Sequence, residues 1–491
     1  MPENDAPNLL YIHSDQHTPF VLGCCGDPIV RTPNIDQLAS NGALFDATYC
    51  NSPICVPSRM SMLTGLHPHQ NHVWTNEHIL DSSIPTLAHA LGSVGYHPVL
   101  IGRLHSVGPD QLRGYAERYV GDHHSNYAAG IRSDRGILEG TAGPHRISLE
   151  LSGSGQSAYQ VHDEYVTVAT VDYLNRLGVQ KRAGLLEKPF CITTGFMLPH
   201  APFVAHRKDF ELYYDTLPLP TITEPFSEEL HPHLYWWRQH TKIESVTEDE
   251  IRRARAAYWG LVTRIDAMIG EIINALHAND LADNTLIIYT SDHGDMVGEH
   301  SLWWKHVFYE HSVRVPLIMA WPDRISAGQR ISNVVSALDI NATILDALDA
   351  PPLPESPGRS LIPLVMGTNS QWENVAFSEY CSDQFCPTGG CYQRMIRRDE
   401  WKLIYYHEQE PQLFNLKDDP DELVNLAGEP GHRLILEELL QQVLQEWNPE
   451  TIKAEMALRR KQESIRTAWL GNTNPRDQYR WEMRSEMNYL D

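Results

Sequence analysis

Four apolar runs in this chain of 491 residues are each followed by side chains that can bind a metal, move a proton or neutralise an anion. The runs and the residues after them are Asn8–Ile12 with Asp15 and Gln16, Pro98–Ile101 with Arg103 and His105, Phe190–Phe196 with His200, and Thr285–Tyr289 with Asp292 and His293. Because open α/β sheets bind ligands beyond the carboxyl ends of their strands, we expect these side chains to converge on one site. Asp15, Asp292 and Gln16 offer oxygen ligands to a hard cation such as Ca²⁺. An imidazole from His293 makes Mn²⁺ the alternative.

A further reactive group lies in the segment NSPICVPSRMSMLTG, residues 51–65. Pro57 can occupy the first turn of a helix, where a missing N–H costs little. Cys55 is then expected just before that helix, close to its free N–H groups and its positive end. Arg59 adds a fixed positive charge one turn further on. This environment suits an anionic nucleophile or a bound oxyanion, although the residues alone also allow a small buried cysteine that only packs.

The elements that would position these groups follow from the spacing of apolar residues. The four runs show no polar–apolar alternation, and helical patterns at Ile84–Val94 and from about Glu248 to Leu276 lie between them. Runs of this kind are typical of parallel strands that are buried on both faces. We therefore predict an α/β fold for residues 1–365, with a large mixed, mostly parallel sheet flanked by helices.

The pattern changes after about residue 365. Short antiparallel strands and one amphipathic helix are predicted at Cys391–Ile396, Trp401–Tyr406, Gln412–Leu416 and, for the helix, His432–Trp447. We expect a smaller α+β domain over residues 366–448. Residues 449–491 lack a strong period but contain aromatic and apolar side chains, unlike a disordered tail. They predict an arm that packs either on its own subunit or across a homo-oligomer.

Composition limits the classes of partner. The chain carries 63 acidic and 39 basic residues, for a formal net charge of −24. Nucleic acids and anionic membranes are therefore not expected as partners, although a local basic pocket could still bind an anionic substrate. The first residues show neither a basic leader region nor an apolar run long enough to span a membrane, which predicts a cytoplasmic protein.

The segment around Cys55 resembles the signature of the type I sulfatases. CVPSR at residues 55–59 and LTG at residues 63–65 match the pattern CxPSR with a trailing LTG. TPNID at residues 32–36, SDHGD at 291–295 and LFNL at 413–416 are also similar to segments of that family. The resemblance covers roughly residues 7–428 and implies the fold of the alkaline phosphatase superfamily.

Two branches of the family are the most similar. GRLHSVGPDQLRG at residues 102–114 and WWK at residues 303–305 resemble segments of choline-sulfatase-type enzymes. Phosphonate monoester hydrolases share the Asp-Gln and Asp-His pairs. The sequence departs from the family at Arg103, because the motif GKxH has lysine there; the positive charge is kept, but a planar guanidinium replaces a point charge.

The resemblance implies a nucleophile that the chain does not encode directly. In the family the cysteine of CxPSR is oxidised after synthesis to formylglycine, so a formylglycine-generating or other sulfatase-maturing enzyme is an expected partner of Cys55. The aldehyde hydrates, and one hydroxyl attacks sulfur. A divalent metal is expected on that hydroxyl, held by Asp15, Gln16, Asp292, His293 and residue 55.

The resemblance also implies roles for the surrounding cations and histidines. Arg59, Arg103 and Lys305 would neutralise the sulfate oxygens. His200 or Lys305 would protonate the leaving oxygen, and His105 would take the proton that releases sulfate. Asn76 is expected to contact the substrate.

Three functions remain open at this point. The first is hydrolysis of a small-molecule or carbohydrate sulfate ester. The second is hydrolysis of phosphonate monoesters or phosphodiesters with the same nucleophile. The third, a protein that only binds sulfated ligands, is disfavoured because Cys55, Arg59, Asp15 and Asp292 are all present.

Overall fold

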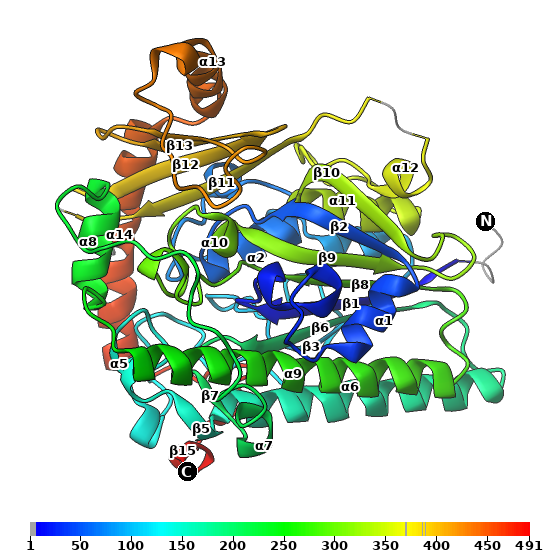
Figure 1. Cartoon of the computed structure of the whole chain (residues 1–491). Helices are drawn as coiled ribbons and strands as arrows, with labels where there is room; N and C mark the ends of the chain where they lie inside the picture. The colour runs from blue at the N-terminus through cyan, green and yellow to red at the C-terminus, as the bar shows by residue number, and fades with distance from the viewer. Residues whose placement is uncertain (1–5, 369–370, 385, 388) are drawn as a thin grey trace.

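A computed structural model describes residues 6–368, 371–384, 386–387 and 389–491. Its largest element is an eight-stranded sheet (Figure 1). The strands, in spatial order, are β10 (Gln329–Ser336), β2 (Ala43–Tyr49), β9 (Arg314–Ala320), β8 (Thr285–Ser291), β1 (Asn8–Asp15), β6 (Phe190–Pro199), β3 (His97–Gly102) and β4 (Glu117–Tyr119). β9 is antiparallel to both of its neighbours, and the other pairs are parallel. The predicted mixed, mostly parallel sheet is therefore confirmed.

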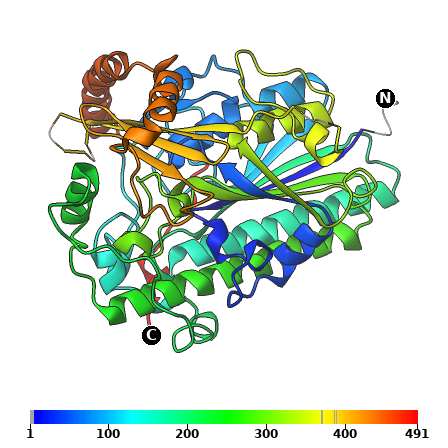
Figure 2. The same cartoon turned by 45° about the horizontal axis from the view of Figure 1, so that its top comes forward.

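Helices cover both faces of this sheet (Figures 1 and 2). One face carries α1 (Pro33–Ser40), α6 (Ala158–Arg182) and α9 (Glu248–Ala278), and the other carries α2 (Cys55–Thr64), α4 (Leu87–Ser93), α11 (Ala337–Ala347) and α12 (Ile362–Val365). Successive residues of β1 enter different cores, because Leu10 and Ile12 pack in one cluster and Leu9 and Tyr11 in the other. This two-sided burial explains why the central strands lack polar alternation.

The strands predicted from the sequence all end at one edge of the sheet. β1 is parallel to β6 and β8, and its pairing brings Asp15 opposite Pro199 and Ser14 opposite Ser291. β3 continues the same parallel set beyond β6. The polar residues that follow these strands therefore meet in space although they are far apart in the sequence.

A second, antiparallel sheet follows the first and lies beyond β10 and β2 (Figure 2). Its strands are β11 (Val375–Ser382), β12 (Cys391–Arg398), β13 (Trp401–Tyr406) and β14 (Gln412–Asn415), and α13 (Arg433–Leu444) packs on it. β12, β13, β14 and α13 lie where the sequence predicts them, whereas β11 was not predicted. The domain boundaries at residues 365 and 448 stay predictions.

The final segment contains a helix that its weak periodicity does not predict. α14 (Pro449–Thr473) begins after Asn448, whose side chain accepts a hydrogen bond from the Thr451 N–H. The chain then returns to the large domain, where β15 (Tyr489–Leu490) pairs with β5 (Gly153–Gln156), which itself pairs with β7 (Val204–Ala205). The arm thus packs on its own subunit, which is one of the two arrangements that the sequence analysis left open.

Short helices connect the remaining parts of the chain. They are α3 (Pro68–Asn71), α5 (Ile147–Glu150), α7 (Arg207–Phe210), α8 (Pro232–Thr241) and α10 (Glu310–Val313). Among the described residues, none of the helices combines the length and the apolar character that crossing a membrane requires.

Candidate active site

Cys55 is the first residue of α2, and its side chain is buried at the carboxyl edge of the sheet. Its Sγ lies 3.2 Å from His293 Nε2, 3.2 Å from Lys305 Nζ and 3.8 Å from Asp15 Oδ1. Burial raises the pKa of the Cys55 thiol to about 11, and the Asp15 carboxylate adds to the rise. As an unmodified cysteine, the residue is therefore a protonated thiol at neutral pH.

Cys55 and three buried side chains around it form a cluster that fits a divalent metal ion. Asp15, Cys55, Asp292 and His293 each offer one ligand atom, and these atoms lie within 4.8 Å of one another. Two carboxylates and one imidazole suit a divalent cation that accepts oxygen and nitrogen ligands. His293 Nδ1 lies 3.0 Å from the Gly294 carbonyl oxygen, which leaves Nε2 for the cluster.

Gln16 lies beside this cluster, and both ends of its amide are already bonded. Its Nε2 donates to Asp295 Oδ2 at 2.5 Å, and its Oε1 accepts from Lys305 Nζ at 2.5 Å. Its backbone N–H donates to Asp292 Oδ1 at 3.0 Å. The predicted role of Gln16 as a metal ligand stays a prediction. Asp295, whose pKa burial raises to about 6, is a partner that the sequence analysis did not single out.

Two arginines neutralise the carboxylates beneath Cys55. Arg59 bonds Asp292 through Nε at 2.9 Å and Asp15 through Nη2 at 3.1 Å, and Arg103 Nε bonds Asp15 at 2.5 Å. Burial acts to raise the pKa of Asp15, but Arg103 and Arg59 outweigh it and hold that pKa well below its usual range. Asp15 is therefore a carboxylate under all ordinary conditions.

His105 is fixed by Arg103 and by a residue that the sequence analysis missed. Arg103 Nη2 lies 2.8 Å from the ring atom Nδ1 of His105. The backbone N–H of His105 donates a hydrogen bond to Asp122 Oδ2 at 2.9 Å. The His105 ring stacks on that of His124 with centroids 4.4 Å apart. Burial, with Arg103, lowers the pKa of His105 well below its ordinary value, so its imidazole is neutral. Asp122 follows the short strand β4, and this strand's position is the signal that could have identified it.

Lys305 joins the nucleophile position to His200. Besides Gln16 and Cys55, its ammonium group contacts His200 Nε2 at 2.9 Å. His200 Nδ1 lies 2.6 Å from the Ala201 carbonyl oxygen, so we assign the proton to Nδ1 and leave Nε2 as the acceptor. Burial, together with Lys305, holds the pKa of His200 well below its usual range. Of the two predicted proton donors, Lys305 is therefore the one that carries a proton towards the cavity.

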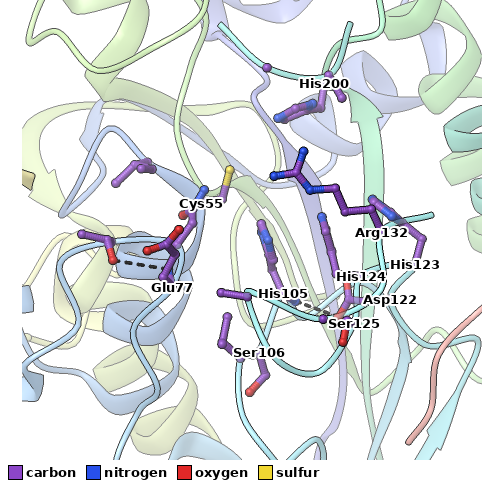
Figure 3. A pocket seen from close by; sticks show the side chains of 18 of the residues that line it. Cys55, Glu77, His105, Ser106, Asp122, His123, His124, Ser125, Arg132 and His200 are labelled. Carbon is purple, nitrogen blue, oxygen red and sulfur yellow. Dashed lines mark hydrogen bonds between the residues drawn. The ribbon is translucent and has the colours of Figure 1, made fainter. Parts of the chain in front are cut away.

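A cavity of about 390 Å³ opens above Cys55 (Figure 3). Six of the predicted site residues line it: Cys55, Asn76, Arg103, His105, His200 and Lys305. Asn76 also accepts the Val56 N–H at 2.9 Å and so satisfies a free donor in the first turn of α2. Asp15, Gln16, Arg59, Asp292 and His293 are buried beneath. The expected convergence is confirmed, and the individual catalytic roles stay predictions.

Comparison with known proteins places this arrangement in a family. The Sulfatase family model matches residues 7–350, and the model described as N-sulphoglucosamine sulphohydrolase, C-terminal, matches residues 298–448. The choline-sulfatase of Rhizobium meliloti (strain 1021) is 33% identical over 440 residues, which cover 86% of this chain and 83% of that protein. Arylsulfatase K of Homo sapiens is 33% identical over 450 residues, covering 86% and 79%.

A solved structure agrees at the level of the fold. The phosphonate monoester hydrolase of Agrobacterium radiobacter superposes with a TM-score of 0.76 at 23% identity, over 91% of this chain and 96% of that one. The resemblance that CxPSR and its accompanying segments suggest is thus supported by sequence and by fold. The chain belongs to the sulfatase family and is a sulfuric ester hydrolase.

Proposed function

We propose that this enzyme cleaves a sulfate monoester with a formylglycine made from Cys55 as its nucleophile. The observation that carries the proposal is the position of Cys55 Sγ. It lies at the floor of the cavity, 3.2 Å from both His293 Nε2 and Lys305 Nζ, where an oxygen on the modified residue would meet the same partners. The thiol itself is a poor nucleophile there, because its pKa is raised to about 11.

Asp15, Asp292, His293 and an oxygen at position 55 would hold one divalent cation, Ca²⁺ in the first instance and Mn²⁺ as the alternative. A cation bound there supplies positive charge to the nucleophilic oxygen and to the sulfate oxygens. Gln16 is a further ligand in this proposal. Its oxygen would exchange the contact with Lys305 for the cation.

The chain's own residues supply the remaining charge and the proton transfers. Arg59 and Arg103 are buried guanidinium groups that favour negative charge on the transferred sulfate. Lys305 donates a proton to the leaving oxygen, and His200 holds its ammonium group in place. His105, a neutral imidazole on the cavity wall, accepts the proton whose loss expels sulfate. Asn76 contacts the substrate from the opposite wall.

The test is the chemical state of residue 55. After expression with a sulfatase-maturing enzyme, mass spectrometry of the peptide that contains Cys55 should show the aldehyde or its hydrate. Cys55→Ala should abolish turnover. Cys191→Ala, which alters a buried cysteine of β6 in the sheet core, is the matched control and should change stability more than rate. A fully active sample with only unmodified thiol at position 55 would overturn the proposal.

The alternative substrate is a phosphonate monoester or phosphodiester. The Asp-Gln and Asp-His pairs at residues 15–16 and 292–293 favour it, because the phosphonate monoester hydrolases carry the same pairs. Rates with an aryl sulfate, choline sulfate, an aryl phosphonate monoester and a phosphodiester, measured on one preparation, decide between the two activities. We propose sulfate esters as the fastest of the four.

A further inference from the structure

One wall of the cavity carries an arginine to which the described residues supply no hydrogen-bond or ion-pair partner. Arg132 lines the cavity and is exposed there. Figure 3 shows its side chain pointing from the loop into the cavity, towards the side on which Cys55 and His200 lie. Within the described part of the chain, its guanidinium group makes no hydrogen bond and no ion pair. The two arginines beneath Cys55 differ in this respect, because Arg59 and Arg103 are bonded to the carboxylates of Asp15 and Asp292.

Arg135, three residues further along, is a second cation without a carboxylate partner. Its Nη2 donates to the Tyr159 hydroxyl at 2.9 Å, and its guanidinium carbon lies 5.7 Å from the centroid of that ring. Its Nε is buried and has no hydrogen-bond partner among the described residues. Arg135 also lines the cavity. Two guanidinium groups therefore line the same cavity, and no carboxylate of the described residues pairs with either of them.

The backbone around Arg132 is held in place by the end of the chain. Arg480 Nη2 donates to the Ile131 carbonyl oxygen at 2.8 Å and to Ser133 Oγ at 3.1 Å. Ser133 Oγ in turn donates to the His123 carbonyl oxygen at 2.7 Å. The residues on both sides of Arg132 are thus bonded while its own side chain is free. The bonded backbone fixes the point from which the Arg132 side chain extends, so that the side chain is the part that must be ordered when a ligand binds.

The neighbouring side chains do not supply the missing negative charge. Burial, then Arg103, lowers the pKa of His124 to about 3, so its ring is neutral. Glu77 lines the cavity but accepts a hydrogen bond from Gln384 Nε2 at 2.7 Å. The acidic residues that line the cavity are Glu77, Asp122 and Glu139, and among the described residues no ion pair joins any of them to Arg132 or Arg135. Asp122 is paired with Arg118 and Arg103 instead. In a protein of net charge −24, this cluster attracts anions locally.

We infer that Arg132 and Arg135 form an anion subsite that binds a carboxylate or a second sulfate on the leaving group of the substrate. The inference rests on the proposed function, because the subsite shares its cavity with Cys55 and Lys305. It names the substrate class as sulfate esters whose alcohol carries a second negative charge. Cationic esters such as choline sulfate are disfavoured by the same two residues.

The test compares two substrates that differ in one charge. 4-Carboxyphenyl sulfate and its methyl ester present the same ring and the same sulfate. The measured quantity is the ratio of kcat/KM for the acid to kcat/KM for the ester. Arg132→Gln should lower this ratio about 10- to 100-fold, the range for loss of a charge-assisted hydrogen bond. Arg132→Lys should restore part of it, and 1,4-phenylene disulfate in place of the acid shows whether carboxylate or sulfate is preferred.

Arg324→Gln is the matched control, because Arg324 is an exposed arginine that does not line the cavity. It should leave the ratio unchanged. The inference is overturned if the ratio stays within about twofold of the wild-type value both in Arg132→Gln and in Arg135→Gln.

The subsite and the proposed function can fail separately. If the fully modified enzyme hydrolyses neither sulfate ester, the proposed function fails, and calorimetric binding of 4-hydroxybenzoate and its methyl ester then decides the subsite. The subsite is supported if the wild-type protein binds 4-hydroxybenzoate more tightly than its methyl ester and if Arg132→Gln abolishes this difference. Equal binding of the two phenols by the wild-type protein overturns it.

Discussion

Lys305 has three ammonium N–H groups, and three acceptors surround them: Gln16 Oε1, His200 Nε2 and Cys55 Sγ. A lysine has no acceptor capacity of its own, so this arrangement uses its donors fully. Sulfur is the weakest of the three acceptors, and an oxygen at position 55 would strengthen the contact. The proposed conversion of Cys55 to formylglycine would therefore also strengthen the contact of residue 55 with Lys305.

Asp292 offers the clearest test of the metal. Asp292→Asn keeps the shape of the side chain but removes a charge from the cluster with Asp15 and His293. We expect metal content and turnover to fall together, by more than the roughly 10- to 100-fold that loss of an outer-shell partner costs. Elemental analysis beside kcat is the measurement. Asp266→Asn is the matched control, because Asp266 is an aspartate outside the cluster that caps the start of α1. This variant should bind as much metal as the wild-type protein. Full activity in metal-stripped enzyme would refute the mechanism.

Sequence patterns identified the site residues that follow long strands, since the end of a buried strand can be recognised from its apolar run. Asp15, His200 and Asp292 are of this kind. Asp122 follows a strand of three residues, which is too short to give such a run. Arg132 lies in a loop whose course depends on Arg480, far away in sequence, and no local pattern carries that information.

At the scale of elements, α11 begins with a buried carboxyl group. Asp339 accepts the N–H groups of Ser336 and Arg359, each at 2.8 Å, and is 2% exposed. Burial raises its pKa to about 6, against the opposing effect of these hydrogen bonds. Since the folded pKa is above the unfolded value of about 3.9, its contribution to stability is complete below about pH 4 and is lost as the pH rises through about 6.

This titration predicts a pH-dependent effect of Asp339→Asn. Between pH 4 and pH 7 the wild-type protein should lose about 3 kcal/mol of unfolding free energy through this group, and the variant should not. The variant's stability relative to wild type should therefore improve as the pH rises. Urea unfolding at several pH values measures it. A difference between the two proteins that stays constant with pH would contradict the assignment.

The second sheet is joined to the first by a buried charge cluster. Lys402 of β13 bonds Glu310 at 2.9 Å and Glu422 at 2.7 Å, and its side chain is fully buried. Glu310 belongs to α10, next to the large sheet. Lys402 is thus the cation shared by the two carboxylates, and Arg314 Nη1 lies 3.5 Å from Glu310 as a second one.

Lys402→Met should lower the free energy of unfolding by about 3–5 kcal/mol, because it removes the buried cation that bonds both Glu310 and Glu422. Arg314, 3.5 Å from Glu310, then remains as a cation for that carboxylate alone. Adding Glu422→Gln should recover part of the loss. Lys417→Met, at an exposed position nearby, should change stability by less than about 0.5 kcal/mol. Guanidinium unfolding curves give all three values, and a loss below about 1 kcal/mol for Lys402→Met would show that the cluster does not stabilise the junction.

Two of the elements that the sequence did not predict, α14 and β9, lack a clear local signal in their residues. α14 buries only Ile452 and Met456, so its apolar residues show no continuous stripe. β9 has seven residues, as many as β8, but it contains Pro316, and a proline within an apolar run argues against a strand. Long apolar strands and α9, whose capping box at Thr247 and Glu250 marks its start, were predicted because their signals are local.

At the scale of the whole molecule, the end of the chain supports the cavity wall. Asp477 accepts hydrogen bonds from Ser125 Oγ at 3.0 Å and from the Asn126 N–H at 2.8 Å. The backbone N–H of Trp481 donates a hydrogen bond to the backbone carbonyl oxygen of Asp122 at 2.9 Å. With Arg480, these contacts hold the loop that carries Arg132. The arm thus has a role within one subunit, and a role in assembly stays a prediction.

Deleting residues 476–491 should raise KM more than it lowers kcat, because the cavity wall loosens while the cluster around Cys55 is unchanged. Arg480→Ala should show the same trend. Arg484→Ala is its matched control, because among the described residues Arg484 pairs with Glu486 alone. Light scattering on the same samples reports the assembly state. A truncated protein that keeps its assembly and its full rate would show that the arm has neither role.

The pairing of β15 with β5 also decides where the protein tolerates a fusion. Tyr489 and Leu490 continue the small sheet, the Asp491 N–H donates to the Ser154 carbonyl oxygen at 3.0 Å, and the Asp491 carboxylate lies 3.2 Å from Arg207 Nε. An affinity tag or reporter appended after Asp491 would add chain at this edge and pull on the segment that holds Arg480. A drop in substrate affinity that appears only in the C-terminally tagged protein would therefore be an effect of the tag. A tag at the N-terminus avoids this edge of the small sheet.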